Sequence, residues 1–233
     1  MELFTTYQGW EYLLRWFHVL AGIVWIGILY YFNFVQTPFF GSDLGGQARG
    51  LMMRGLVPNA MWWFRWGAMA TFLTGWFIIL GRGFHLGVSW GGPYMTTILT
   101  GAAMGSLMWF NVWFIIWPAQ RLGIASAEAV AAGGEADPAA AAAAPRAGRA
   151  SRTNTLFSIP LLWAMTGAAN VPGTYVVDSL GLYWAIALGL IILLEINALA
   201  SSFPLQGMLG KVSSTLHLGF GLAIVLYILQ HVL

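Results

Sequence analysis

The chain has 233 residues, of which 59% are hydrophobic and 8% are charged, and its formal net charge is +2. Soluble domains carry about 25% charged residues, so this composition excludes a water-soluble globular domain and predicts a protein surrounded by membrane lipid. The small net charge gives no indication of nucleic-acid binding. Because the chain contains no cysteine, disulfides, thiolate metal sites, iron–sulfur clusters and covalently attached c-type haem are excluded within it.

Six apolar segments approach the length needed to cross a hydrocarbon core, which is about 20 residues in a helix. The fourth is the shortest and contains Pro160, so its ends are the least well defined. The segments run from Tyr12 to Gln36, Met61 to Leu80, Tyr94 to Trp117, Thr155 to Val171, Leu180 to Ser201, and Val212 to Leu233. The predicted fold is therefore all-α, a polytopic bundle of about six transmembrane helices that forms a single membrane domain over residues 1–233.

One segment differs from the rest in composition. Residues 125–150 form a run of alanine, glycine and proline with scattered charges. Alanine favours a helix, but the apolar surface of this run is too small to pack firmly. The sequence therefore predicts a flexible extramembrane loop between the third and fourth apolar segments.

The lysine and arginine residues predict the orientation. With six crossings, Arg15 and Arg82 fall on one side of the membrane and eight basic residues fall on the other. Those eight are Arg49, Arg54, Arg65, Arg121, Arg146, Arg149, Arg152 and Lys211. Cytoplasmic loops are enriched in lysine and arginine, so residues 125–150 are predicted to be cytoplasmic and both termini are predicted to lie outside.

His18 lies within the first apolar segment, where Gly22 and Trp25 share its face at helical spacing. Ionisable groups within a bilayer are costly, at about 2.5–3.5 kcal/mol for a carboxylate at the helix centre on insertion scales, so each one needs a reason. A histidine beside a glycine leaves room for a large, flat group, which suggests an axial ligand of haem. The alternative is a structural histidine that is hydrogen-bonded to a neighbouring helix.

Glu195 and His217 lie in the fifth and sixth segments, both in the half that is predicted to face the cytoplasm. Glu195 is a candidate for a proton relay, a substrate-binding carboxylate or the partner of a cation. His217 is a second candidate haem ligand, and a carboxylate could fix the tautomer of its imidazole. The alternative is a structural pair with no role in chemistry.

Other polar and small residues are expected to hold the bundle together. Gly101 and Gly105 have the spacing of a close helix contact. Four asparagines fall in the cytoplasmic half and favour interhelical hydrogen bonds. These are Asn33, Asn111, Asn154 and Asn197.

Two stretches resemble the membrane-bound urate hydroxylases, whose membrane part is called the urate oxidase N-terminal family. The first is RWFHVLAGIVWIGILYYFNFVQTPFF, from Arg15 to Phe40, and the second is SRTNTLFSIPLLWAM, from Ser151 to Met165. The resemblance implies a bacterial inner-membrane protein that oxidises urate to 5-hydroxyisourate. From the buried histidines we separately expect haem b as the cofactor, with Glu195 tuning or protonating the haem pocket.

The chain departs from that family pattern in two respects. The resemblance implies a cytochrome c domain after the membrane part, but this chain ends at Leu233, so electrons are expected to pass to a separate c-type cytochrome or to quinone. It also implies a histidine near the position that Asn170 occupies. Without that histidine, urate chemistry is less strongly indicated.

Two other functions compete with a redox protein. One is a non-catalytic accessory subunit of a larger respiratory or photosynthetic membrane complex, which would retain the fold without the chemistry. The other is a small transporter, for which Glu195 and nearby asparagines are the evidence. No inverted sequence repeat supports the transporter.

Overall fold

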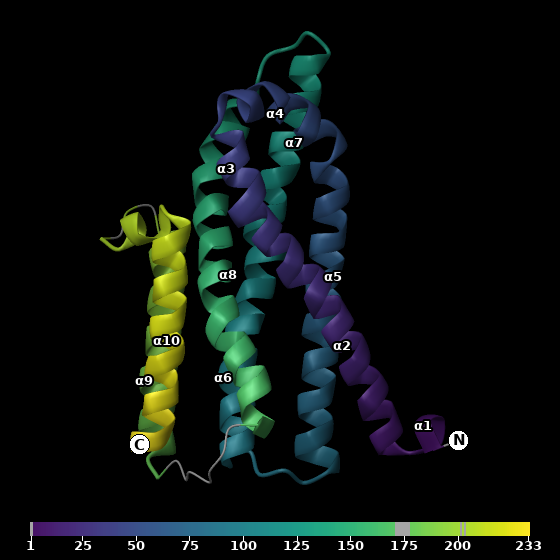
Figure 1. Ribbon diagram of the computed structural model, residues 1–233, viewed down its shortest axis with the longest axis vertical. Coiled ribbons are helices and arrows are strands. Elements are labelled where there is room, and N and C mark those ends of the chain that lie inside the picture. Colours follow the sequence, from purple (N-terminus) through teal and green to yellow (C-terminus); the bar gives the residue numbers. More distant parts are fainter. Residues whose placement is uncertain (1, 171–177, 201, 203) are drawn as a thin grey trace.

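The computed structural model describes residues 2–170, 178–200, 202 and 204–233, and every element in that part of the chain is a helix (Figure 1). In chain order the elements are α1 (Glu2–Thr5), α2 (Tyr7–Tyr30), η1 (Tyr31–Gln36), α3 (Thr37–Phe40), α4 (Asp43–Gly55), α5 (Val57–Leu80), η2 (Gly81–His85), α6 (Pro93–Phe110), η3 (Asn111–Ile116), α7 (Trp117–Ala131), α8 (Pro138–Asn170), α9 (Leu180–Leu199), η4 (Gln206–Leu209) and α10 (Val212–Val232). The predicted all-α membrane bundle is confirmed.

The helices begin where the sequence offers start signals. Thr6 and Ser42 cap α2 and α4, because each hydroxyl accepts a hydrogen bond from a backbone N–H three residues later. Prolines occupy the first turns of α5, α6, α7 and α8, where a missing N–H costs nothing. The elements η1, η2 and η3 are π-helical turns that continue α2, α5 and α6 without a break.

Five continuous helices in the described part are long and apolar enough to cross a membrane. They are Tyr7–Phe40, Val57–His85, Pro93–Ala131, Leu180–Leu199 and Val212–Val232. The remaining expected segment, from Thr155 to Val171, coincides with the C-terminal part of α8, and Val171 lies outside the described residues. Helix α8 has a buried polar stretch from Thr153 to Ser158. A helix that packs against protein on several sides does not need the continuous apolar surface of a lipid-facing helix.

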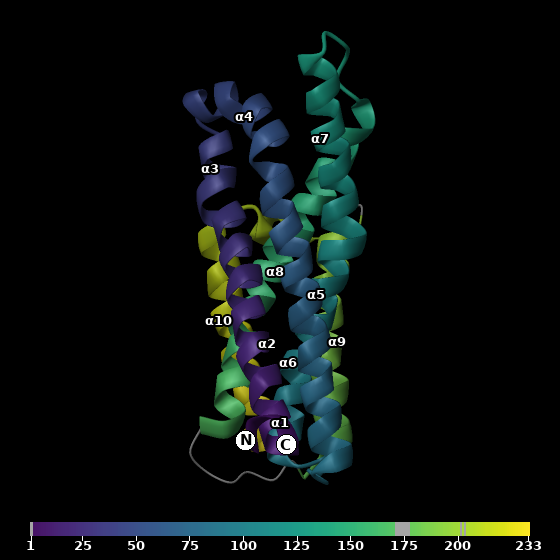
Figure 2. The ribbon, with the colours of Figure 1, turned by 90° about the vertical axis from the view of Figure 1, so that its right-hand side faces the viewer.

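The bundle consists of helix pairs that pack side by side. Helix α2 lies along α5 and α6 lies along α8 (Figure 1). Helices α9 and α10 both pack against α8, but Figure 2 shows them on different sides of the bundle. Both termini lie at the same end of the bundle, as an even number of crossings requires. The structure contains no membrane, so the side on which the termini lie stays a prediction.

Small residues allow the closest helix approaches. A Cβ atom on Gly101 would lie 2.6 Å from Met165 Cε, and one on Gly105 would lie 3.2 Å from Leu161 Cδ1. Both contacts are made by α8, so the predicted role of Gly101 and Gly105 in close helix packing is confirmed. Gly67 plays the same part between α5 and α2, where a Cβ would lie 3.2 Å from the backbone nitrogen of Trp25.

One end of the bundle extends past the level at which α9 and α10 end (Figure 1). At a rise of about 1.5 Å per residue, α9 is about 30 Å long, whereas Pro93–Ala131 is about 58 Å long. Figure 1 shows α4 and α7 beyond the level at which α9 and α10 end. Because about 30 Å suffices to cross the hydrocarbon core, we place this end outside the bilayer.

The segment 125–150 is not the loop that the sequence predicted. Helix α7 continues to Ala131 and α8 begins at Pro138, so residues 132–137 are the part without helix. Alanine has the highest helix propensity, and here it outweighs the small apolar surface of the segment. Most of the segment is exposed, and its predicted mobility stays a prediction.

The orientation can be tested with reporter fusions at the N-terminus, at Gly134 and after Leu233. We expect both terminal fusions to report an external location and the Gly134 fusion to report a cytoplasmic one, because of the bias in lysine and arginine. Paired reporters that are active on opposite sides of the membrane supply the measurement. An external reading at Gly134 would contradict the proposed orientation.

Limited proteolysis tests the mobility of residues 132–137. This segment lies between two helices, the few hydrogen bonds that its backbone N–H groups donate go to the end of α7, and its side chains are exposed, so its free energy of local opening should be small. We expect a nonspecific protease, added to inverted membrane vesicles, to cut here before any other cytoplasmic segment, as judged by mass spectrometry. First cleavage within α4 instead would show that 132–137 is the better protected segment.

Candidate functional site

A cavity of about 540 Å³ lies between α2, α5, α6 and α8. Its walls are mainly apolar, and small residues widen it on three of the four helices. These small residues are Gly22, Gly75, Gly101, Ala102 and Gly105. Ile23 and Leu162 line the cavity although they are 64% and 42% exposed, so the cavity opens to the lipid between α2 and α8.

His18 projects into this cavity from α2, and its hydrogen bond defines its tautomer. The Thr74 hydroxyl donates to the backbone oxygen of Ala70 at 2.6 Å, so it is an acceptor for His18 Nδ1 at 3.0 Å. Nδ1 therefore carries the proton, and Nε2 presents a lone pair. An imidazole in this state is a ready metal ligand.

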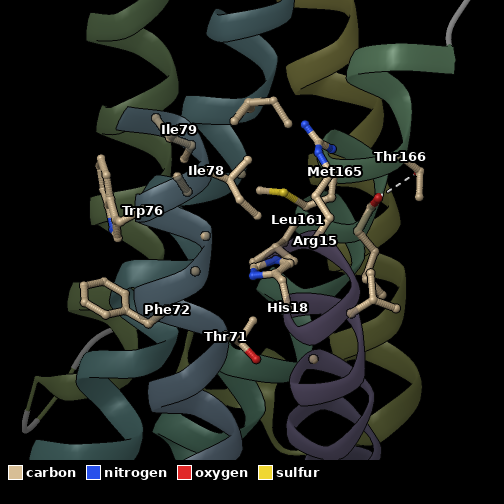
Figure 3. A pocket seen from close by; sticks show the side chains of 18 of the residues that line it. Arg15, His18, Thr71, Phe72, Trp76, Ile78, Ile79, Leu161, Met165 and Thr166 are labelled. Carbon is tan, nitrogen blue, oxygen red and sulfur yellow. Dashed lines mark hydrogen bonds between the residues drawn. The ribbon is translucent and has the colours of Figure 1, made fainter. Parts of the chain in front are cut away.

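Gly75 leaves the space that the imidazole of His18 occupies. A Cβ at this position would lie 3.0 Å from His18 Cε1 and 3.5 Å from Nδ1. Figure 3 shows the His18 ring near the middle of the cavity, with Met165 close by and with Phe72 and Trp76 of α5 on the other side. The ring is thus held by Thr74 and backed by a residue without a side chain.

One end of the cavity carries two arginines and one carboxylate. Arg15 and Arg82 line the cavity, and each places a nitrogen 2.7 Å from the same oxygen of Glu11, Oε1. Arg15 also donates to the hydroxyl of Tyr94 at 3.4 Å, and the guanidinium of Arg82 lies 4.9 Å from the centroid of the Tyr94 ring. This end is polar and carries more positive than negative charge.

A second polar cluster lies between α6, α8 and α9, and it is centred on Asn111. The Asn111 amide donates from Nδ2 to Asn154 Oδ1 at 2.9 Å and to Glu195 Oε2 at 3.2 Å. Asn111 and Asn154 are fully buried and Glu195 is 7% exposed. Among the described residues, Glu195 Oε1 and Asn111 Oδ1 have no hydrogen-bond partner. Asn111 opens a π-helical turn, a feature that often occurs at functional sites.

The buried face of α8 extends this cluster toward α2. Asn33, in the π-helical turn η1, donates from Nδ2 to Ser151 Oγ at 2.8 Å, and the hydroxyls of Tyr30 and Ser158 lie 2.8 Å apart. The asparagines at positions 33, 111 and 154 thus connect helices, which confirms their predicted role. Asn197 is buried as well, but its Oδ1 has no partner among the described residues.

The structure separates the three predicted site residues. His18 lines the cavity, whereas Glu195 lies in the second cluster and is not among the described residues that line the cavity. The expected interior position of His217 is wrong. Its side chain is exposed on α10, and its Nδ1 lies 2.7 Å from the backbone oxygen of Ser213 on the same helix. Glu195 and His217 do not form the predicted pair.

The reason for the error at His217 is that α10 is not amphipathic but apolar on all sides. Apolar periodicity therefore gave no indication of which face is buried. Sequence analysis also missed Arg15, Thr74 and Arg82 as parts of the site. Arg15 precedes His18 by one helical turn, and that spacing was the available signal.

The fold and its cavity define a polytopic helical membrane protein with a lipid-accessible cavity and a polar core. A family model described as "Urate oxidase N-terminal" matches residues 92–229, more than half of the chain. The chain belongs to this family. The match covers α6 to α10 and the second of the two stretches on which the resemblance was based, whereas His18 lies outside it. No curated protein and no solved structure matches the chain.

The polar core can be tested by replacing Asn154 with alanine. This change removes the acceptor for Asn111 and the donor to the backbone oxygen of Met108, so we expect the free energy of unfolding to fall by about 1–2 kcal/mol. Unfolding in mixed micelles measures the effect. Asn170→Ala is the matched control, because Asn170 is exposed and donates to its own helix at Thr166. Equal effects of the two changes would contradict a stabilising core.

Proposed function

We propose that this chain is a membrane redox protein that binds haem b in the cavity, where Nε2 of His18 would hold the iron. The observation that carries the proposal is the hydrogen bond between His18 and Thr74, which leaves the Nε2 lone pair available within the cavity. Metal-binding histidines typically have their other ring nitrogen fixed in this way.

The residues present fit such a group in three respects. The walls are apolar, the cluster of small residues leaves room for a flat ring system, and the arginines at one end suit acidic substituents. When bound, haem would supply one-electron chemistry, and the protein would tune it through the axial ligand and the polarity of the pocket. Thr74 would orient the imidazole of His18, and Gly75, which has no side chain, would leave space for that ring.

The reaction that we propose is the oxidation of urate to 5-hydroxyisourate, on the strength of the family to which the chain belongs. This conversion adds the oxygen of one water molecule and releases two electrons and two protons. We propose that the electrons pass to a separate c-type cytochrome or to quinone. Glu195 is our candidate for carrying a proton, since its Oε1 has no partner among the described residues. We place the protein in the inner membrane of a bacterium.

The alternative is an accessory subunit of a larger membrane complex. Two observations support it. Asn170 stands where the resemblance implies a histidine, and its side chain is exposed and bonded to its own helix. Glu195 is bonded within the bundle rather than placed at the cavity. On this alternative, the polar core would serve stability and assembly alone.

The absorption spectrum of the purified protein tests the proposal. We expect a reducible Soret band in the wild-type protein and its loss, by at least about tenfold in haem content, in His18→Ala, because no other described histidine lines the cavity. His217→Ala is the matched control and should retain the haem, since His217 faces away from the bundle interior. A wild-type protein that never carries haem would favour the accessory subunit.

Thr74→Val is a milder variant that should preserve the fold. Valine has the shape of threonine but removes the hydroxyl that accepts from His18 Nδ1, so the ring loses this side-chain partner. We expect haem affinity to fall about 10- to 100-fold, as for other ligands that lose their supporting hydrogen bond. Unchanged affinity would show that the Thr74 bond has no part in ligation.

A further inference from the structure

We propose that the ligand of this cavity is an amphiphile with a carboxylate, and that Arg15 and Arg82 bind this carboxylate at the polar end of the cavity. The inference rests on the proposed use of the cavity as a binding site. Beyond that use, the inference specifies the chemical group that the ligand must carry and the position of that group in the cavity. The ligand would place its apolar body beside His18 and its acid beside the arginines.

The charges at the polar end are not balanced. Two guanidinium groups share the single oxygen Oε1 of Glu11, so one positive charge remains after this carboxylate is counted. The side chains of Arg15 and Arg82 are 42% and 28% exposed, whereas that of Glu11 is 8% exposed. The two guanidinium groups therefore remain accessible to a second anion, whereas the carboxylate of Glu11 is buried.

Contacts with neighbouring groups preorganise both guanidinium groups. Glu11 precedes Arg15 by one turn of α2, whereas Arg82 comes from η2 at the end of α5. Tyr94 of α6 contacts both arginines, one through its hydroxyl and the other through its ring. A guanidinium that is held in this way loses less entropy when it binds a carboxylate in the bidentate manner that arginine favours.

The rest of the cavity requires an apolar body. The walls beyond the arginines are mainly aliphatic and aromatic, with His18 and three hydroxyl groups among them, and the opening between α2 and α8 faces the lipid. A small hydrophilic anion would leave this apolar volume unfilled. A molecule that enters from the lipid with its acid toward the membrane surface would fill the apolar part of the cavity and place its carboxylate at the arginines.

Two classes of molecule share this chemistry. The propionates of haem are carboxylates on a flat apolar ring, and a fatty acid is a carboxylate on an apolar chain. His18 favours haem, since a fatty acid has no use for a free imidazole nitrogen. For either class, we expect esterification of the acid to weaken binding. The two classes are distinguished by whether the porphyrin or the fatty acid binds.

The test compares acids with their esters on the purified full-length protein. Ferric protoporphyrin IX and its dimethyl ester are titrated and followed by the Soret band. In parallel, doxyl-stearic acid and its methyl ester are followed by the immobilised fraction of the spin-label signal. We expect the porphyrin diacid to bind at least about tenfold more tightly than its ester, which corresponds to about 1.4 kcal/mol.

Two substitutions should change this preference in opposite directions. Arg82→Gln removes one cation and should reduce the preference for the acid to about threefold or less. Glu11→Gln removes the competing carboxylate and should increase the preference, whereas a purely structural ion pair would give weaker binding of acid and ester alike. Arg54→Gln is the matched control, because Arg54 is exposed on α4 and bonded to its own helix at Gly50.

The outcomes separate this inference from the proposed function. A preference for the stearic acid that depends on Arg82, without binding of either porphyrin, would retain the carboxylate site and overturn the haem proposal. Equal affinity for acid and ester in both series would overturn the carboxylate site. Tight binding of both porphyrins, with equal affinities, would retain haem while removing the role of the arginines.

Discussion

Every polar group that this chain buries must find a partner within the bundle, because lipid offers none. Helix α8 supplies several of these partners. Its stretch from Thr153 to Ser158 is buried. Asn154 and Ser158 in this stretch bond to η3 and α2, and the nearby Ser151 bonds to η1. Helix α8 thus provides hydrogen-bond partners to several other elements, although it is less apolar than the helices that it packs against. A bundle of uniformly apolar helices would lack such bonds, which fix the register of each pair.

The same arrangement explains why a cavity exists beside α8. Helices α2 and α5 approach closely at Gly67, and α6 and α8 approach closely at Gly101. Each pair is tight, but α2 and α8 have few contacts with each other. The space between the two pairs is closed at its inner end by the hydrogen bond between Tyr30 and Ser158, one helical turn beyond the lining residues of α2 and α8. Glycines that allow close packing of one pair thus also line the space between the pairs.

The sequence predicted more of the fold than of the site, for identifiable reasons. Apolar length found the spanning helices, and the asparagines were correctly expected to bond between helices, because burial in lipid leaves few alternatives. Residues 125–150 were expected to be a loop because composition indicated weak packing, while the helix propensity of alanine proved stronger. His18 was placed correctly since glycines mark its face. His217 was not, because the sixth segment is apolar on every side and its buried face depends on the neighbouring helices.

The two polar clusters, the charged end of the cavity and the core around Asn111, come from different parts of the chain. The region that matches the family contains Asn111, Asn154 and Glu195, the centre of the polar core, whereas Tyr30 and Asn33 extend the core from the helices before it. His18, Arg15 and Arg82 come from the helices before it. The cavity is formed where the two halves meet, since α6 and α8 supply two of its walls and α2 and α5 supply the other two. A change in α6 or α8 therefore acts on both clusters, whereas a change at Thr74 or Arg82 acts on the cavity without altering a bond of the polar core.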